Sequence, residues 1–305
     1  MTMTTTATTK SDVRLHAHEN APTRRPFARR RFLRVLLHVV VALLMVVWFT
    51  PILALFVSSI RTQSDTASSG WWTVFVEPLF TGYNYQRAMS IVGVGDSVST
   101  SLAIAIPVTV STTLVSALGA YSLTRMRFRG RAALSLLLVA MMVVPPQVTL
   151  VPMLKFFNLV GLAGTVPAVW IYQVGFTLPF GIFLLRGFMA SIPEELFESA
   201  SLDGASPLSI FRSIVLPLSV PAMMSLAIMQ FLWSWNDLLV PLIFLGGSNL
   251  SAPITVQVAG LVQTTGQGEA QLMAATFVSI LLPLILIVSL QRYFVRGVLG
   301  GAVKG

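Results

Sequence analysis

Six stretches of the chain are long and apolar enough to cross a membrane as helices. The hydrocarbon core of a bilayer is about 30 Å thick, and about 20 mostly apolar helical residues span it. The six stretches cover residues 35–57, 99–123, 132–152, 164–185, 218–245 and 272–290. They are too continuous to be the alternating strands of an outer-membrane barrel. Only 10% of the 305 residues are charged, too few to cover the surface of a soluble protein. We therefore predict an all-α integral membrane protein with six transmembrane helices.

The basic residues indicate which ends of these helices face the cytoplasm. Cytoplasmic loops of membrane proteins carry an excess of Lys and Arg. Of the 20 Lys and Arg residues, 17 lie in the N-terminal tail, in the loops after the second and fourth helices, or after the sixth helix. Arg61, Arg87 and Lys155 are the three on the opposite side. This distribution predicts a multi-pass protein with both termini in the cytoplasm.

The same placement explains the net charge of +9 without nucleic acid. Basic residues beside membrane helices determine topology and contact anionic lipid head groups. The sequence has no basic stripe with interleaved aromatic residues, which would favour a nucleic-acid partner. It has no Cys, which excludes a thiol nucleophile, a disulfide and a Cys-ligated metal. It also lacks His, Asp and Glu clusters at the spacing of metal ligands or acid–base pairs, which argues against a membrane enzyme.

The predicted helices divide the chain into five segments. These are a disordered basic cytoplasmic tail (1–31), a first transmembrane helix (32–60), an extracytoplasmic segment (61–97), a five-helix core (98–297) and a cytoplasmic C-terminal tail (298–305). Trp71, Trp72 and Tyr83 in the extracytoplasmic segment are typical of an aromatic belt at the membrane surface. A second outer loop, 246–271, is long enough that we expect it either to have a function or to be disordered.

The loop between the fourth and fifth stretches, 191–221, predicts two short amphipathic helices at a bend. Ser191 and Glu194 have the spacing of a capping box, with Pro193 in the first turn of the first helix. Asp203–Gly204 ends that helix, because Gly accepts the left-handed conformation of a sharp exit.

The second predicted helix of this loop begins at Ser206, a capping residue followed by Pro207. We expect Pro217 and Pro221 to end it before the fifth transmembrane helix begins. Such short helices are marginal alone in water, so their apolar faces need a surface to pack on. That surface is either this protein's own helices or the groove of a cytoplasmic partner. A DNA-reading helix-turn-helix is disfavoured, because the second helix offers only Arg212 for DNA contacts.

Segment 191–221 resembles the EAA loop of ABC-importer permeases. The matching residues are Glu198–Ala200, Leu202–Ala205, Phe211, Ile214, Leu216–Pro217 and Pro221. Ser199 stands where the family usually has Ala, which exchanges one small residue for another. Residues 120–131, 144–153 and 231–244 and the ending with QRYFVRG and GGAVKG are also similar to this family. They resemble its carbohydrate-uptake branch, and within it the maltose-transporter-type smaller permease subunit.

The resemblance implies the type I ABC-importer permease fold, with a cytoplasmic coupling helix between helices 4 and 5. It implies a bacterial-type cytoplasmic (inner) membrane location and four partners: a second permease subunit of a different sequence, a dimeric cytoplasmic ATPase, an extracytoplasmic solute-binding protein, and a sugar substrate. It assigns ATP and Mg to the ATPase and no cofactor to this chain. The sequence agrees, because it contains no G-x-x-x-x-G-K-[ST] phosphate-binding loop.

The resemblance also assigns residues to the contact with the ATPase. Glu198, Ala200, Asp203, Gly204 and Phe211 correspond to the family's coupling loop. Gly301, Ala302 and Lys304 lie in the ending that resembles the family's extension toward the ATPase, and a frayed terminus is the alternative. Loop 246–271 lies where family members contact the binding protein.

Asp237 is the one carboxylate within the six predicted spans, and an ionisable residue inside a membrane is a candidate functional residue. With Gln230, Trp233 and Asn236 it could form a polar, aromatic path for sugar hydroxyls and ring faces. The alternative is that Asn236 and Asp237 cap a helix break near the outer end of the fifth span. Tyr172 and Gln173 are further candidates for the substrate path. Pro145–Pro146 is expected to break the third span, and broken helices can line a cavity.

Three functions therefore stay open at the level of the sequence. The first is the permease of an ATP-driven sugar importer. The second is the same machinery for another solute, such as a polyamine or a peptide. The third is a secondary carrier driven by an ion gradient, although such carriers usually have several intramembrane carboxylates and internal repeats.

Overall fold

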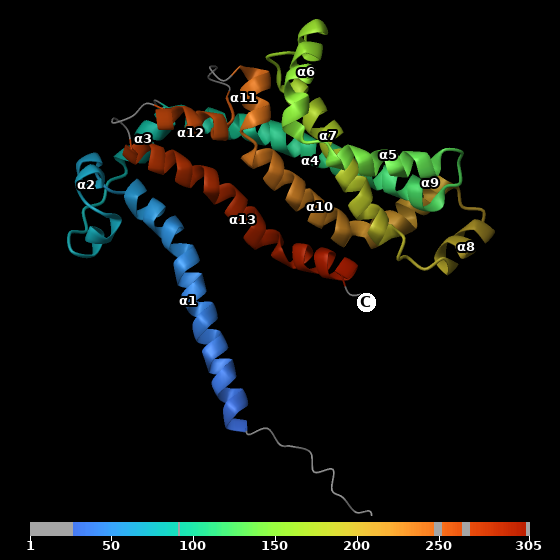
Figure 1. Ribbon diagram of the computed structural model, residues 1–305, viewed down its shortest axis with the longest axis horizontal. Helices are drawn as coiled ribbons and strands as arrows, with labels where there is room; N and C mark the ends of the chain where they lie inside the picture. Colours follow the sequence, from blue (N-terminus) through green and yellow to red (C-terminus); the bar gives the residue numbers. More distant parts are fainter. Residues whose placement is uncertain (1–26, 91, 247–251, 264–268, 303–305) are drawn as a thin grey trace, which may run out of the picture. The chain divides into compact units, whose positions relative to one another are not determined.

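The computed structural model describes residues 27–90, 92–246, 252–263 and 269–302, which form helices and the turns between them (Figure 1). The chain separates into two units, Met1–Ile52 and Leu53–Gly305. The first contains most of α1 (Phe27–Ser59), a 33-residue helix with apolar residues on all sides. Within the described residues, five helices are long and apolar enough to cross a membrane. A sixth crossing results if the bent pair α5 and α6 counts as one span, which agrees with the six predicted stretches.

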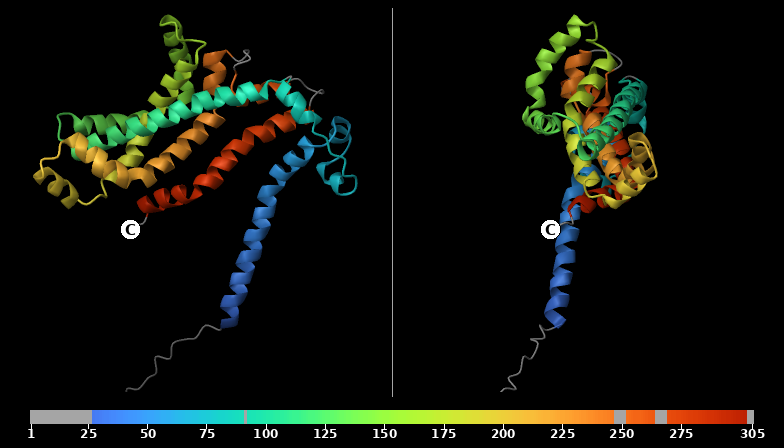
Figure 2. Two further views of the ribbon diagram at one scale, coloured as in Figure 1. Left: turned by 180° about the vertical axis from the view of Figure 1, so that it is seen from behind. Right: turned by 90° about the vertical axis from the view of Figure 1, so that its right-hand side faces the viewer.

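The longest helices of the second unit are α4 (Val94–Arg125), α7 (Val166–Met189), α10 (Leu216–Asn236) and α13 (Glu269–Ala302). α4 packs against α7 and α10, and α10 packs against α13 (Figures 1 and 2). Small residues let α4 and α7 approach closely, as is common between membrane helices. A Cβ at Gly181 would collide with Ser116, and one at Gly119 would lie 2.9 Å from Ile182.

α4 contributes to three separate clusters of buried residues, of which the first two overlap along the helix. Its start, with Val94 and Ala105, packs in a cluster with residues of α3, α10, α12 and α13. Its middle, with Ile104 and Val108, packs with α6, α7 and α11. Its end, with Tyr121, packs with the ends of α7 and the start of α10. Residues of α4 therefore take part in the packing at both ends of the bundle.

Two spans are broken by short turns. α5 (Arg131–Val143) and α6 (Pro146–Leu159) meet at an angle of 101°, which confirms the break predicted at Pro145–Pro146 (Figure 1). α10 ends at Asn236, and α11 (Leu239–Leu245) follows after a two-residue turn. α11 packs against α6 and α7, so the two breaks lie in the same part of the bundle.

Both predicted outer loops contain helices. Segment 61–97 forms α2 (Gln63–Ser68), the 3₁₀ helix η1 (Trp71–Phe75), α3 (Tyr83–Ser90) and the start of α4. Arg61, only 4% exposed, holds its first turns together by donating to the carbonyl oxygens of Asp65 and Gly70. In loop 246–271, residues 254–263 form α12 (Ile254–Gln263), which packs against α4 and α13. Residues 247–251 and 264–268 of that loop lie outside the described residues.

Candidate functional site

The first helix of segment 191–221 is α8 (Glu195–Leu202), which projects at one end of the second unit (Figures 1 and 2). The predicted capping box is wrong. Ser191 does not cap α8, because its hydroxyl donates to the carbonyl oxygen of Phe188 at the end of α7. The helix starts at Glu195, one residue after Glu194, and Pro193 precedes the first turn.

The bend after α8 is as predicted. Asp203 is the C-terminal capping residue, and Gly204 follows with φ of +75°, in the left-handed region. The N–H of Ala205 donates to the carbonyl oxygen of Ala200 at 3.0 Å, which closes the turn. A Cβ at Gly204 would meet nothing within 4 Å. The backbone angle, and not lack of space, therefore requires glycine here.

The second helix of the segment begins as predicted but does not end as predicted. Ser206 accepts a hydrogen bond from the N–H of Ser209, and Pro207 is the first residue of α9 (Pro207–Ile210). However, α9 continues through a π-helical turn, η2 (Phe211–Val215), directly into α10. In the wider turn the N–H of Leu216 donates to the carbonyl oxygen of Phe211, five residues back. Pro217 follows directly after this wider turn, as the second residue of α10.

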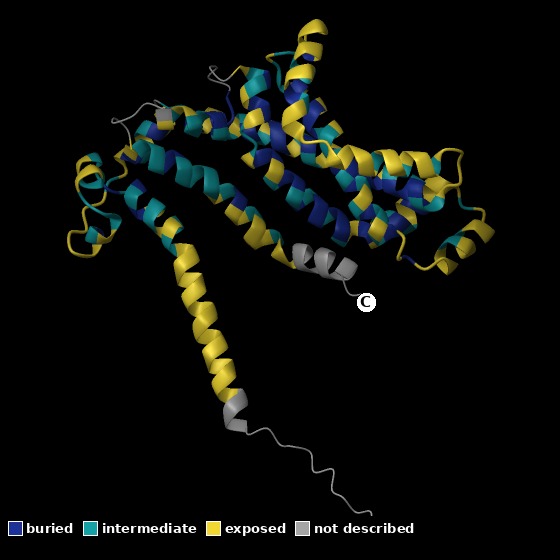
Figure 3. Cartoon of the chain, in the orientation of Figure 1, coloured by how far each residue is buried: buried dark blue, intermediate teal, exposed yellow. Residues whose placement is uncertain are grey.

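Segment 191–221 has one face packed on its own chain and one face exposed. Ala200 packs partly against the cluster at the end of α4, and Phe211 is buried within it. Glu198, Asp203 and Gly204 are exposed (Figure 3). Leu202, at the tip of α8, is 89% exposed. Phe211 is therefore buried against the bundle and Ala200 packs partly against the same cluster, whereas the other predicted coupling residues lie at the surface.

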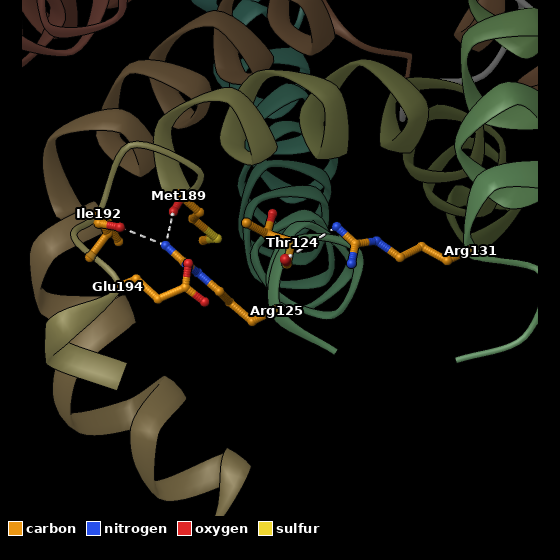
Figure 4. Close-up of polar contacts among 6 residues, drawn as sticks. All are labelled: Thr124, Arg125, Arg131, Met189, Ile192 and Glu194. Carbon is orange, nitrogen blue, oxygen red and sulfur yellow. Dashed lines mark hydrogen bonds and ion pairs between the residues drawn. The ribbon is translucent and has the colours of Figure 1, made fainter. Parts of the chain in front are cut away.

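Arg125, one of the 17 basic residues on the predicted cytoplasmic side, joins this segment to α4 (Figure 4). Its Nη2 donates to the carbonyl oxygens of Ile192 at 2.6 Å and Met189 at 3.2 Å. Its guanidinium carbon lies 3.9 Å from the centre of the Phe197 ring, in a cation–π contact. Nη1 lies 4.0 Å from a carboxylate oxygen of the exposed Glu194. By contrast, Arg131 donates to Thr124 in its own neighbourhood.

A cavity of about 420 Å³ lies where the two broken spans meet. It is lined by Pro146, Gln147, Leu150, Leu232, Trp233, Asn236, Asp237, Leu239 and Val240. Three of the six candidate substrate-path residues, Trp233, Asn236 and Asp237, are therefore brought together. Gln147 was not predicted, although its position directly after Pro145–Pro146 is the signal that could have identified it.

Tyr172 and Gln173, neighbours on α7, do not line this cavity but hold the two breaks that form it. The Tyr172 hydroxyl donates to the carbonyl oxygen of Pro146 at 2.9 Å and lies 2.7 Å from the hydroxyl of Thr149. Gln173 donates from Nε2 to Asp237 Oδ2 at 2.8 Å, and its Oε1 accepts from Ser234 at 2.6 Å. Both side chains are buried, at 5% exposed.

Asp237 caps the break in the fifth span, as one of the two sequence interpretations proposed. Its Oδ1 accepts a hydrogen bond from the N–H of Val240 in the first turn of α11. Asn236 does not cap, because its amide donates back to the carbonyl oxygen of Leu232. Gln230 is 1% exposed and is not among the residues that line the cavity.

The structure describes two of the three residues near the C-terminus that were predicted to contact the ATPase. Gly301 and Ala302 lie in the last turn of α13, and Lys304 lies outside the described residues.

Comparison with known proteins places these features in a family. Residues 112–300 match the family described as binding-protein-dependent transport system inner membrane component. The chain is 44% identical to the osmoprotective compounds uptake permease protein GgtD of Synechocystis sp., over 88% of this chain and 91% of that protein. It is 43% identical to the alpha-glucoside transport system permease protein AglG of Rhizobium meliloti, over 82% of this chain and 67% of that protein.

Among solved structures, the chain resembles one chain of a bacterial ABC transporter involved in the import of the acidic polysaccharide alginate. The TM-score is 0.74 with 21% sequence identity, over 88% of this chain and 99% of that chain. At this identity the likeness supports the fold alone, and it agrees with the predicted type I importer permease fold.

Proposed function

Because this chain belongs to the family of binding-protein-dependent transport system inner membrane components, we propose that it is the permease subunit of an ATP-driven importer for a sugar or oligosaccharide. It is a multi-pass inner-membrane transport subunit and not a catalytic enzyme. Family membership favours ATP-driven import over a carrier driven by an ion gradient. The alpha-glucoside permease among its relatives supports the sugar.

The observation that carries the coupling role is the exposed surface of α8. Leu202 is 89% exposed, and the exposed Glu198 and Asp203 lie near it in the sequence. Together they form an apolar and acidic patch on a helix that projects from the bundle. Exposed apolar side chains of this kind suit a protein contact. We assign this surface to a dimeric cytoplasmic ATPase that binds ATP and Mg, since this chain carries no phosphate-binding loop.

The cavity between the broken spans is the proposed substrate path. The exposed indole of Trp233 can stack on a sugar ring, and Gln147, Asn236 and Asp237 can hydrogen-bond to hydroxyl groups. A second permease subunit of different sequence would complete the path.

Three further contacts belong to the same proposal. An extracytoplasmic solute-binding protein delivers the sugar, and loop 246–271 contacts it. Gly301, Ala302 and Lys304 face the ATPase at the cytoplasmic end of the chain. Basic residues at that end contact anionic lipid.

Reconstitution into liposomes tests the function directly. The chain would be assembled with its partner permease, the ATPase and the binding protein, and uptake of a labelled α-glucoside would be measured. We expect uptake only with ATP inside and binding protein outside. Uptake driven by a proton or sodium gradient without ATP would contradict the proposal. A photo-cross-linking residue at Leu202 should capture the ATPase, and a matched probe at the exposed Ser68 of α2 should not.

The similarity to the osmoprotective compounds permease favours a second candidate substrate class, a small osmoprotective solute. Competition against the labelled α-glucoside separates the two classes. Unlabelled oligosaccharides should abolish uptake if sugar is the substrate, whereas osmoprotectants, polyamines and peptides should not compete.

A further inference from the structure

The last two turns of α4 contact both halves of segment 191–221. Arg125 contacts its beginning, through the carbonyl oxygens of Met189 and Ile192 and through the ring of Phe197 on α8. Tyr121, one helical turn earlier, contacts its other half. The Tyr121 hydroxyl donates to the carbonyl oxygen of Pro207 at 3.0 Å, and its ring lies 5.3 Å from that of Phe211.

These polar contacts accompany a buried apolar cluster that includes Tyr121 and Phe211. A largely apolar cavity of about 620 Å³ lies between α4, α7 and α9 beside Tyr121 and Phe211. Tyr121 and Arg125 therefore add polar bridges to the buried apolar cluster that packs the end of α4 against α7 and Phe211. The Arg125 side chain is only 15% exposed, unlike the exposed Arg127 and Arg129 in the loop that follows. A basic residue that only determines topology has no need to be buried against two carbonyl groups.

The middle of α4 also packs near the substrate cavity. Ile104 and Val108 pack in the same cluster as Tyr172, Leu150 and Val240, which hold or line the two helix breaks. The 22 residues from Ile104 to Arg125 span about 30 Å of helix. A helix of this length, packed at both ends, can transmit a displacement between them.

From this geometry we propose that Arg125 and Tyr121 are positioning residues that make α8 and the end of α4 move as one body. This inference rests on the proposed function, because it takes the ATPase to be the source of the movement. The movement then reaches the substrate cavity through α4, in addition to the direct chain connections of α8 to α7 and α10. Arg125 serves this purpose because its planar guanidinium can bond two carbonyl oxygens while stacking on Phe197.

The test compares Arg125→Gln, Arg125→Lys and Tyr121→Phe in the assembled transporter, with Arg129→Gln as the matched control. Arg129→Gln removes the same charge four residues later, at an exposed position of the loop after α4. The first readout is ATPase stimulation by solute-loaded binding protein. We expect Arg125→Gln to lower stimulation roughly tenfold, as for the loss of a charged hydrogen bond, with Arg125→Lys and Tyr121→Phe intermediate. ATPase co-purification should stay at the parental level for all four variants.

The second readout distinguishes movement from simple stability. The chain has no Cys, so spin labels can be placed at Glu195→Cys on α8 and Leu114→Cys on α4 without other changes. In the parent and in Arg129→Gln, the distance between the labels should be the same with and without ATP. In Arg125→Gln it should change with ATP, because α8 moves without α4. A constant distance together with parental stimulation in Arg125→Gln would overturn the inference. A parent that shows no stimulation at all would instead overturn the proposed function.

Discussion

At the scale of single residues, Gly204 and Asp237 show two different reasons for a fixed residue type. Gly204 is required by its backbone angle, since no neighbouring atom would meet a side chain there. Asp237 is required by its partners, since it accepts hydrogen bonds on both carboxylate oxygens. A substitution at Gly204 can therefore test the need for its backbone angle. A substitution at Asp237 can test the need for its two hydrogen bonds.

We predict that Gly204→Val leaves membrane insertion intact and abolishes ATPase stimulation. A side chain in the left-handed region costs about 1–2 kcal/mol, and a branched one more, so the bend after α8 would change. Gly204→Asn should keep most of the stimulation, because Asn tolerates this region. The measurement is binding-protein-stimulated ATP hydrolysis, normalised to the amount of assembled transporter. Parental transport by Gly204→Val would show that the bend is not needed.

A second residue-scale prediction concerns the pair Asp237 and Gln173. In Asp237→Asn, the introduced amide N–H₂ must face either the Gln173 amide or the N–H of Val240, which leaves two donors opposed. An unsatisfied buried group costs about 1–3 kcal/mol, so we expect a lower thermal midpoint and weaker transport. Adding Gln173→Glu supplies carboxylate acceptors for the introduced amide and for the Ser234 hydroxyl, and should restore both. If the double variant is as impaired as the single one, the hydrogen-bond interpretation is wrong.

At the scale of helices, proline alone did not decide where a helix ends. Pro145–Pro146 breaks the third span as predicted, but Pro217 and Pro221 do not separate α9 from α10. The difference is the π-helical turn before Pro217, which a sequence pattern does not reveal. Likewise, Ser191 and Glu194 have the capping-box spacing, yet the end of α7 takes the Ser191 hydroxyl. Local signals placed the bend at Gly204 correctly, because nothing from a neighbouring helix competes there.

The prediction at the scale of helices concerns the Tyr172 hydroxyl, which contacts the start of α6 at the break after α5. Tyr172→Phe removes the hydroxyl that holds the start of α6, while the ring stays packed against Phe176 and Phe244. At about 1 kcal/mol per hydrogen bond, we expect a modest fall in the free energy of unfolding and a larger loss of transport. Thr149→Val, which removes one partner of the same hydroxyl, is the control and should have the smaller effect. A transport rate unchanged by Tyr172→Phe would show that the break does not depend on this contact.

At the scale of the whole molecule, the number of spans and the class of fold were predictable because apolar length and charge placement are local properties. The candidate sites were predictable only in part. Trp233, Asn236 and Asp237 share one stretch of sequence, and the cavity includes all three. The contacts that organise the sites join residues 64 positions apart, as in Arg125 with Met189 and Gln173 with Asp237. Such pairs are set by how helices pack, which composition and spacing do not encode.

The orientation in the membrane is the last prediction, and it follows from the 17-to-3 distribution of basic residues. Because the chain has no Cys, single cysteines at the exposed Ser68 on α2 and Ser201 on α8 can be labelled without background. In intact cells stripped of any outer barrier, an impermeant maleimide should label Ser68→Cys at once and Ser201→Cys only after the membrane is opened. The parent chain is the control for non-specific labelling. The reverse pattern would place α8 outside, where no ATP-hydrolysing partner could reach it, and would contradict the coupling role together with the predicted topology.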